Sequence, residues 1–144
     1  MNEEITIKRV EKKHITELQE ISKKTFADTF SSSNTEEDMQ KYLNESFSED
    51  QLLKELKNQN SLFFFAMINQ KIVGYLKLNI GDAQTEVYDM NSLEIERIYV
   101  LESFQGKKIG QILFDKAVEI TKNLNLHTIG LGVWEKNISA NNFY

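Results

Sequence analysis

The residues of this sequence that could do chemistry stand close together, in a stretch from residue 92 to residue 124. Within it, residues 105–110 read Gln-Gly-Lys-Lys-Ile-Gly, directly before apolar residues at helical spacing. The first turn of a helix has unpaired N–H groups and a partial positive charge, so a glycine-bearing turn here favours binding of an anion such as phosphate. The alternative is an ordinary turn between a strand and a helix.

Two carboxylates precede this turn. Residues 93–100 are rich in β-branched and aromatic side chains and predict a strand. Glu94 and Glu96 are two residues apart, so we expect them on one face of that strand, with Arg97 on the other face. A carboxylate on the buried side of a strand is expected to have a raised pKa, as a general base requires.

Other segments predict the elements that position these residues. Alternating or continuous apolar residues predict further strands at 4–10, 61–68, 72–80 and 127–134. Helical periodicity predicts helices at 14–30, 36–44 and 49–57, besides the helix that residues 105–110 open. Asn34 or Thr35 is expected to cap the second helix, and residues 48–51 resemble a capping box for the third. The succession of strand, helix and strand after residue 92 predicts a parallel pair with a right-handed crossover.

Composition excludes several classes of protein. The 144 residues suit one domain, which we place at 1–144, and they contain no cysteine and only two histidines. Disulfides, a thiol nucleophile and a cysteine or histidine metal site are therefore excluded. The net charge of −5 argues against nucleic-acid binding. No signal peptide or membrane span is evident, so we expect a cytoplasmic protein that binds neither nucleic acid nor membrane.

The run E-R-I-Y-V-L-x-x-F-Q-G-K-K-I-G resembles motif A of the GNAT superfamily, the Gcn5-related N-acetyltransferases. That motif, [Q/R]-x-x-G-x-[G/A], holds the pyrophosphate of acetyl-CoA. Gln105, Ile109 and Gly110 match it, whereas Lys108 replaces the usual middle glycine, at a cost in backbone freedom. The resemblance implies cofactor contacts from the strand and the turn, with no metal; the residues concerned are Ile98, Tyr99, Val100, Gln105, Gly106, Lys107, Lys108, Ile109, Gly110 and Gln111.

A second motif supports the same resemblance. Residues 137–144 read N-x-x-A-x-x-F-Y, a pattern that GNAT proteins commonly carry. The resemblance implies that Asn137 contacts the pantetheine arm and that Tyr144 is the general acid. Taken alone, the segment would be the start of an amphipathic helix with Asn137 as its N-cap.

The resemblance also implies a fold class: an α/β (α+β) fold with a mixed central sheet flanked by helices. In this fold the last two predicted strands splay apart to admit the pantetheine arm. The family normally continues with closing strands, so we expect C-terminal strands to be missing from a truncated domain, or another subunit to cover the exposed strand edge.

The implied reaction is direct transfer of the acetyl group to an amine. Only a neutral amine is nucleophilic, so the site must take up a proton through Glu94, through Glu96 or through a water chain that uses neither. The backbone N–H groups of residues 98–100, freed by a bulge in the strand, are expected to stabilise the oxyanion. Tyr144 would then protonate the departing thiolate.

The sequence indicates the reaction more clearly than the amine that accepts the acetyl group. The motifs resemble most closely the bacterial spermine/spermidine (polyamine) N-acetyltransferases, and the acidic residues between 28 and 50 fit a polycation. Two alternatives remain: acetylation of a protein N-terminus or lysine, and a non-catalytic acyl-CoA-binding regulatory module. We expect a small-molecule amine as the partner and consider a homodimer possible.

Overall fold

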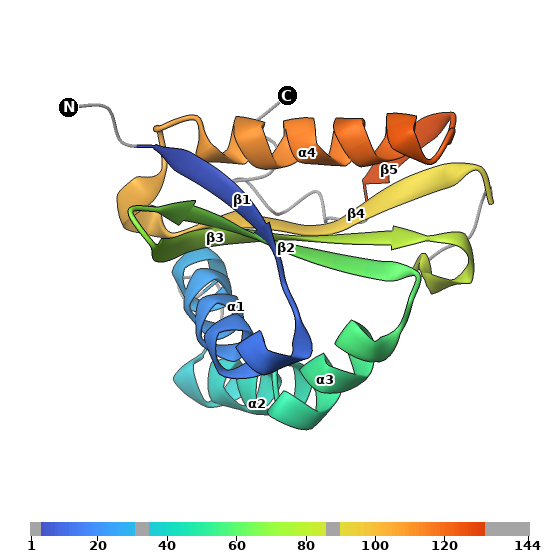
Figure 1. The fold of residues 1–144 in the computed structure, drawn as a ribbon. Coiled ribbons are helices and arrows are strands. Elements are labelled where there is room, and N and C mark those ends of the chain that lie inside the picture. The colour runs from blue at the N-terminus through green and yellow to red at the C-terminus, as the bar shows by residue number, and fades with distance from the viewer. Residues whose placement is uncertain (1–3, 31–34, 86–89, 132–144) are drawn as a thin grey trace.

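A five-stranded sheet crosses the centre of the protein in the order β1-β2-β3-β4-β5 (Figure 1). The computed structural model describes residues 4–30, 35–85 and 90–131. The first four strands pair antiparallel, and β5 pairs parallel to β4. This mixed sheet confirms the predicted strands and the parallel last pair; the strands are β1 Ile5–Arg9, β2 Ser61–Ile68, β3 Lys71–Ile80, β4 Ser92–Val100 and β5 Thr128–Leu131.

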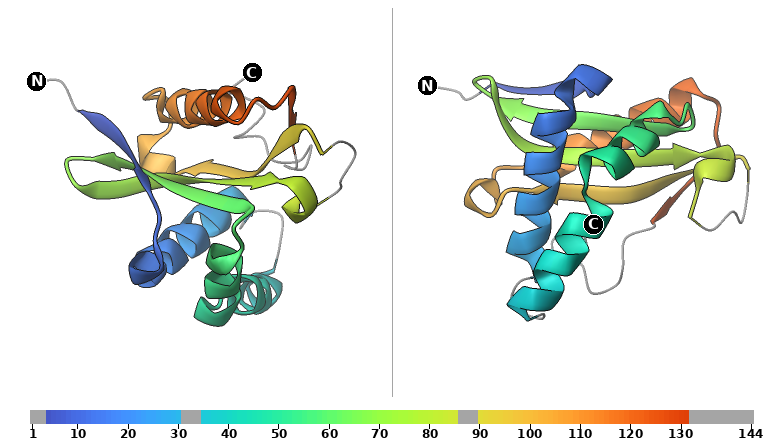
Figure 2. Two further views of the ribbon diagram at one scale, coloured as in Figure 1. Left: turned by 45° about the vertical axis from the view of Figure 1, so that its right-hand side comes forward. Right: turned by 90° about the horizontal axis from the view of Figure 1, so that it is seen from below.

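Helices cover both faces of the sheet (Figures 1 and 2). One face carries three helices, α1 Ile15–Phe30, α2 Glu36–Ser46 and α3 Glu49–Lys57, and the other carries α4 Ile109–Asn123. Three short 3-10 helices, η1 Lys12–His14, η3 Gly81–Ala83 and η4 Glu102–Phe104, join these elements. The α/β fold class expected from the sequence is therefore confirmed.

The two faces of the sheet bury separate apolar clusters. Phe64, Ala66 and Ile68 of β2 belong to the cluster that packs under α4, whereas Phe63 and Phe65 belong to the cluster that packs under α1–α3. Successive side chains of a strand point to opposite faces, so only a nearly continuous apolar strand can serve both clusters. The continuous apolar run of residues 61–68 is explained by this double burial.

The helix caps follow the sequence with one exception. The Thr35 hydroxyl accepts from the Asp38 N–H at 3.1 Å, and the Ser48 hydroxyl accepts from the Gln51 N–H at 3.1 Å. The predicted capping box at residue 48 is only half formed, because the Gln51 amide donates to Glu55 at 2.9 Å. The Ser48 hydroxyl therefore caps the start of α3, but the Gln51 side chain does not complete the box and holds Glu55 instead.

A β-bulge interrupts β4. Lys77 of β3 lies opposite Arg97, but the next residue, Leu78, lies opposite Ile95, so Glu96 is the extra residue on β4. The side chains of Glu96 and Arg97 consequently both reach the face covered by α1–α3, where Arg97 contacts Glu55 of α3. The expectation that Arg97 lies on the opposite face from Glu96 was wrong, because simple alternation does not survive a bulge.

Candidate active site

The turn before α4 has an unusual backbone. The helix begins at Ile109 rather than at Gln105, because Gly106 has a φ of +84° and Lys108 has a φ of +66° and a ψ of 15°. Such left-handed conformations suit glycine and are unfavourable for a residue with a Cβ atom. Lys108 therefore occupies a conformation for which the family's usual glycine is better suited, as the sequence implied.

The N-terminus of α4 is arranged to receive an anion. Among the described residues no side chain caps this end of the helix, and the helical hydrogen bonds start with the Ile112 N–H donating to the Lys108 carbonyl at 3.1 Å. A Cβ atom at Gly106 would meet no atom within 4 Å, so a ligand can approach the backbone there. The backbone N–H groups of residues 109–111 precede the first helical hydrogen bond, and such groups at a helix start suit an anion.

The edge of β4 that faces β5 carries a second set of N–H groups. The Leu101 N–H donates to the Val73 carbonyl at 2.8 Å, toward β3. Consecutive N–H groups of a strand point to opposite edges, so the N–H groups of Ile98 and Val100 point away from β3 and that of Tyr99 points toward it. Two of the three predicted donors thus face the edge where β5 pairs, and the Gln105 amide closes the turn by donating to the Val100 carbonyl at 3.3 Å.

The described pairing of β5 covers only Ser92–Ile95 of β4. Among the described residues no strand pairs with Ile98 and Val100 on that edge. Asn137 and Tyr144 lie outside the described residues. Residues 132–134, the end of the last predicted strand, lie outside them as well. The splaying of the two strands and the roles of these two residues therefore stay predictions.

Glu94 and Glu96 lie on one face, as expected, and share a donor. The side-chain amide of Asn79 on β3 donates to both carboxylates at 2.8 Å. Glu94 is 6% exposed and also accepts from the N–H of Thr85 at 2.9 Å and from the Thr85 hydroxyl. In the described part of the chain Glu94 has neutral donors and no ion pair.

Glu96 belongs to a closed set of charges that we call the ion-pair ring: Glu55, Lys77, Glu96 and Arg97. The Lys77 ammonium lies 2.9 Å from a carboxylate oxygen of Glu55 and 2.9 Å from one of Glu96. The Arg97 guanidinium lies 3.2 Å from Glu55 and 3.3 Å from Glu96. The ring balances two cations with two anions, each mostly buried, and joins α3 to β3 and β4.

The ring determines the charge state of Glu96. Burial pushes the pKa of Glu96 upward, but the charges of Arg97 and Lys77 and the hydrogen bonds from Lys77 and Asn79 outweigh burial. The pKa of Glu96 is consequently below its ordinary value of 4.5, rather than raised as the sequence led us to expect. A carboxylate with a lowered pKa is a weak proton acceptor.

Glu96→Gln is expected to lower the free energy of unfolding by about 2 kcal/mol at pH 7. Because the pKa of Glu96 is lower in the folded chain than in the unfolded chain, the ionised carboxylate stabilises the fold above pH 4.5, and this stabilisation disappears as the pH falls through the folded pKa. Urea unfolding of both proteins at pH 7, 5, 4 and 3 should show the difference shrinking with acidity. A difference that stays constant would contradict the charge account.

Lys108→Gly tests the strain in the turn. Replacing any lysine by glycine increases the backbone freedom of the unfolded chain, so a matched control is needed. Lys107→Gly removes the same charge, but Lys107 does not have a left-handed backbone conformation that glycine could relieve. Lys108→Gly should be the more stable of the two by about 1–2 kcal/mol in thermal or urea unfolding. Equal stability of the two variants would show that Lys108 is not strained.

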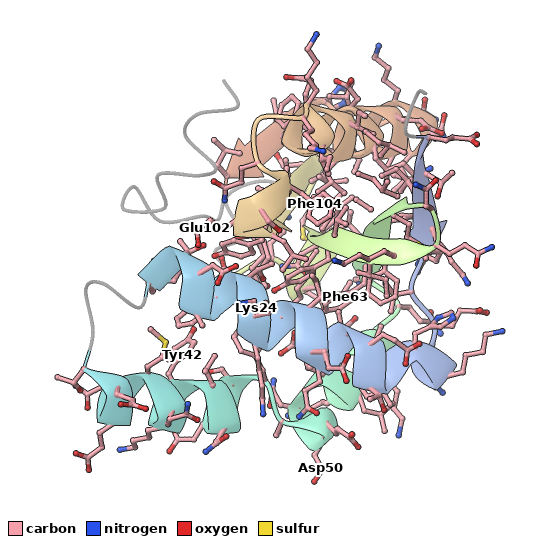
Figure 3. The ribbon with its side chains drawn as sticks, turned by 90° about the vertical axis from the view of Figure 1, so that its left-hand side faces the viewer. Lys24, Tyr42, Asp50, Phe63, Glu102 and Phe104 are labelled. Carbon is pink, nitrogen blue, oxygen red and sulfur yellow. The ribbon has the colours of Figure 1, made fainter. Side chains whose placement is uncertain are left out.

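The acidic residues of α2 and the start of α3 lie on the surface of the described structure. Glu36, Glu37, Asp38, Glu45, Glu49 and Asp50 are exposed. Asp28 on α1 pairs with Lys24 at 3.3 Å and accepts from the Glu102 N–H at 3.4 Å, and Figure 3 shows Glu102 beside the C-terminal end of α1. Asp28 therefore helps to place η4, directly before the anion-binding turn.

The sequence analysis missed three residues of the site: Glu55, Lys77 and Asn79. One signal was available, since Lys77 and Asn79 interrupt the apolar strand β3, and both are buried, at 5% and 0% exposed. A buried lysine requires an anionic partner. Nothing in the sequence indicated that this partner would be Glu55, which lies 22 residues away.

Among the described residues, no group of three or more histidine, aspartate or glutamate side chains is placed to hold a metal ion. The described helices also include none that is long and apolar enough to cross a membrane.

Comparisons with known proteins agree with the fold. Residues 16–144 match the acetyltransferase (GNAT) family. The chain is 44% identical, over 97% of its length and 81% of the relative's, to a protein named uncharacterized N-acetyltransferase in pepI 3'region, from Lactobacillus delbrueckii subsp. lactis. It is 25% identical, over 97% of its length and 84% of the relative's, to the spermidine N(1)-acetyltransferase of Thermoplasma acidophilum.

A solved structure is similar in fold. The crystal structure of the PaiA N-acetyltransferase from Thermoplasma acidophilum in complex with coenzyme A superposes with a TM-score of 0.83 and 25% identity, covering 98% of this chain and 86% of that one. The chain belongs to the GNAT family. It is an N-acetyltransferase, and its co-substrate is acetyl-CoA, which the open turn at Gly106 and the uncapped start of α4 fit.

Proposed function

We propose that the protein transfers the acetyl group of acetyl-CoA directly to a primary amine of a polyamine such as spermidine or spermine. One observation carries the choice of a cationic acceptor. Glu94 shares the amide of Asn79 with Glu96, and Glu96 shares Lys77 and Arg97 with Glu55. These three carboxylates are thus linked through shared partners, and the described cations Lys77 and Arg97 balance only two of them. The remaining negative charge favours an ammonium group. The spermidine N(1)-acetyltransferase that is 25% identical supports the same class of acceptor.

Acetyl-CoA supplies an activated acetyl group, and the residues of this chain bind and orient it. In our proposal the uncapped N-terminus of α4 and the cations Lys107 and Lys108 hold the pyrophosphate. The N–H groups of Ile98 and Val100 donate to the carbonyl oxygen of the acetyl group and draw charge onto it. The N–H group of Tyr99 points toward β3 and takes no part, a change from the expected set of three donors.

Glu94 is the proposed proton acceptor. Its carboxylate is held by the neutral donors Asn79 and Thr85, whereas Glu96 is held by two cations that lower its pKa. Because Glu94 has no cationic partner among the described residues, we propose that it accepts the proton of the substrate ammonium, directly or through water. We propose that Tyr144 donates a proton to the departing thiolate and that Asn137 contacts the pantetheine arm.

The experiment measures release of CoA with a thiol reagent, because the chain contains no cysteine to add background. The acceptors are spermidine, spermine, lysine peptides and aminoglycosides, and Tyr144→Phe is assayed beside the natural chain. Turnover that is highest with polyamines supports the proposal. Turnover confined to lysine peptides would overturn the acceptor class, and binding of acetyl-CoA without turnover on any amine would favour a regulatory module.

Cytoplasmic location, homodimer formation and the absence of nucleic-acid and membrane partners stay predictions from the sequence. Gel filtration with light scattering would measure the oligomeric state directly. The assignment of residues 1–144 to a single domain likewise stays a prediction.

A further inference from the structure

We infer that Glu55 of α3 is a positioning residue for acetyl transfer, because the ion-pair ring that it closes holds the bulge of β4 in place. The inference rests on the proposed role of the Ile98 and Val100 N–H groups as donors to the acetyl carbonyl. It does not depend on which amine accepts the acetyl group.

Glu55 is fully engaged by protein groups. One oxygen of its carboxylate accepts from Lys77 at 2.9 Å and from Arg97 at 3.2 Å. The other oxygen accepts from the side-chain amide of Gln51, one helical turn earlier, at 2.9 Å. With both oxygens occupied and a side chain that is 13% exposed, Glu55 is placed to hold its neighbours rather than to bind a substrate.

The bulge creates the need for Glu55. It turns the adjacent side chains of Glu96 and Arg97 toward the same face, where Lys77 of β3 adds a second cation. Glu96 alone would leave two buried cations sharing one anion, and a buried charge without a partner is strongly destabilising. Glu55 supplies the second anion, so the bulged register of β4 and the position of α3 stabilise each other.

The position of Arg97 determines where the next N–H group of β4 lies. Ile98 follows Arg97 in β4, and its N–H group points to the edge proposed to bind the acetyl carbonyl. Misplacement of a catalytic donor by about 1 Å can lower a rate by about 100-fold. The N-terminus of α4, in contrast, lies on the other face of the sheet from Glu55 (Figure 1). Loss of Glu55 should therefore disturb catalysis much more than affinity for CoA.

Glu55→Gln tests this separation, with Glu20→Gln as the matched control. Glu20 is exposed on α1, which covers the same face of the sheet, and it is outside the ion-pair ring. We expect Glu55→Gln to lower kcat by about 10- to 100-fold while the Kd for CoA, measured by calorimetry, changes by less than about 2-fold. Glu20→Gln should match the natural chain in both quantities.

A second readout needs no acceptor amine. In the natural chain, exchanging CoA for acetyl-CoA should shift the backbone amide signals of Ile98 and Val100 in nitrogen-15 NMR spectra. In Glu55→Gln these shifts should be lost. If Glu55 were merely structural, its replacement would lower the melting temperature, but the molecules that remain folded would still show the shifts. An unchanged response, or no response in the natural chain, would overturn the inference.

Lys77→Met combined with Glu55→Gln guards against a single variant that folds poorly. The double variant removes one anion and one cation, so Arg97 stays paired with Glu96 and the charges stay balanced. The methionine side chain takes the place of the Lys77 side chain, whose ammonium lies 5.5 Å from the centroid of the Phe63 ring. Its kcat should be at least about 3-fold higher than that of Glu55→Gln. If kcat of the double variant is no higher than that of Glu55→Gln, the ion-pair ring is not the cause of the loss.

The proposed acceptor is tested separately. If the natural chain does not acetylate polyamines but does acetylate another amine, the proposed acceptor is rejected, and the comparison of these variants can be made with that other amine.

Discussion

Replacing Glu94 by glutamine is expected to lower kcat by at least about 100-fold, because a glutamine amide cannot accept the proton of the substrate ammonium. The fold should tolerate the change, since the amide oxygen still accepts hydrogen bonds from Asn79 or Thr85. The Kd for CoA should stay nearly constant, as Glu94 lies at the opposite end of β4 from the turn that precedes α4. Steady-state rates and calorimetry measure the two quantities.

Glu96→Gln is the matched comparison for this result. Both glutamates lie on one face of β4 and share the amide of Asn79, but only Glu96 pairs with Lys77 and Arg97. We expect Glu96→Gln to affect stability more than Glu94→Gln. Because Glu96 belongs to the ion-pair ring, its loss should also lower kcat by about 10-fold, but less than the loss of Glu94 does. The reverse order of kcat would assign the proton transfer to Glu96, and full activity in both variants would assign it to a water chain that uses neither.

Gly74→Ala is expected to lower the free energy of unfolding by about 2–3 kcal/mol. A Cβ atom at Gly74 would lie 2.6 Å from the carbonyl oxygen of Tyr99 and 3.3 Å from the Cα atom of Val100. Both are backbone atoms of the neighbouring strand, so only a displacement of β4 can relieve the clash. Because Gly74 pairs with Val100, kcat should fall as well. Urea unfolding and the CoA-release assay measure the two effects.

Gly130→Ala provides the control on the neighbouring side of β4. Among the described atoms, a Cβ atom there would meet the Leu93 carbonyl oxygen alone, at 4.0 Å, an ordinary contact distance. The free energy of unfolding should change by less than about 0.5 kcal/mol. Similar losses in both variants would show that alanine is disfavoured in this sheet for a reason other than the clash with β4.

The fold was predictable because each signal in the sequence is local. The alternation of residues 4–10, the continuous apolar run at 61–68 and the caps at Thr35 and Ser48 depend on neighbours within one turn or one strand. The turn before α4 was located for the same reason, since its glycines and lysines are adjacent, and its binding of an anion stays a prediction. The start of α4 was placed four residues too early, because the left-handed backbone of Lys108 ends the turn at a residue that rarely adopts it.

The candidate site was predictable only in part. Glu94 and Glu96 were placed on one face correctly, because that follows from their spacing. Arg97 was placed on the wrong face and the pKa of Glu96 was expected to shift in the wrong direction, because both depend on the bulge and on charges from other strands and helices. Glu55 lies 22 residues from Lys77 and 42 from Arg97, a separation that no local pattern reports.

The sequence by itself determined the order of the elements, the family and the position of the turn before α4, because periodicity, capping and a contiguous motif are properties of neighbouring residues. Only the tertiary structure decided that two glutamates of similar appearance are electrostatically different. Pairing of β3 with β4 places Lys77 beside Glu96, and packing of α3 places Glu55 beside Lys77 and Arg97. The charge state of a buried group depends on such partners, which folding brings together from distant parts of the chain.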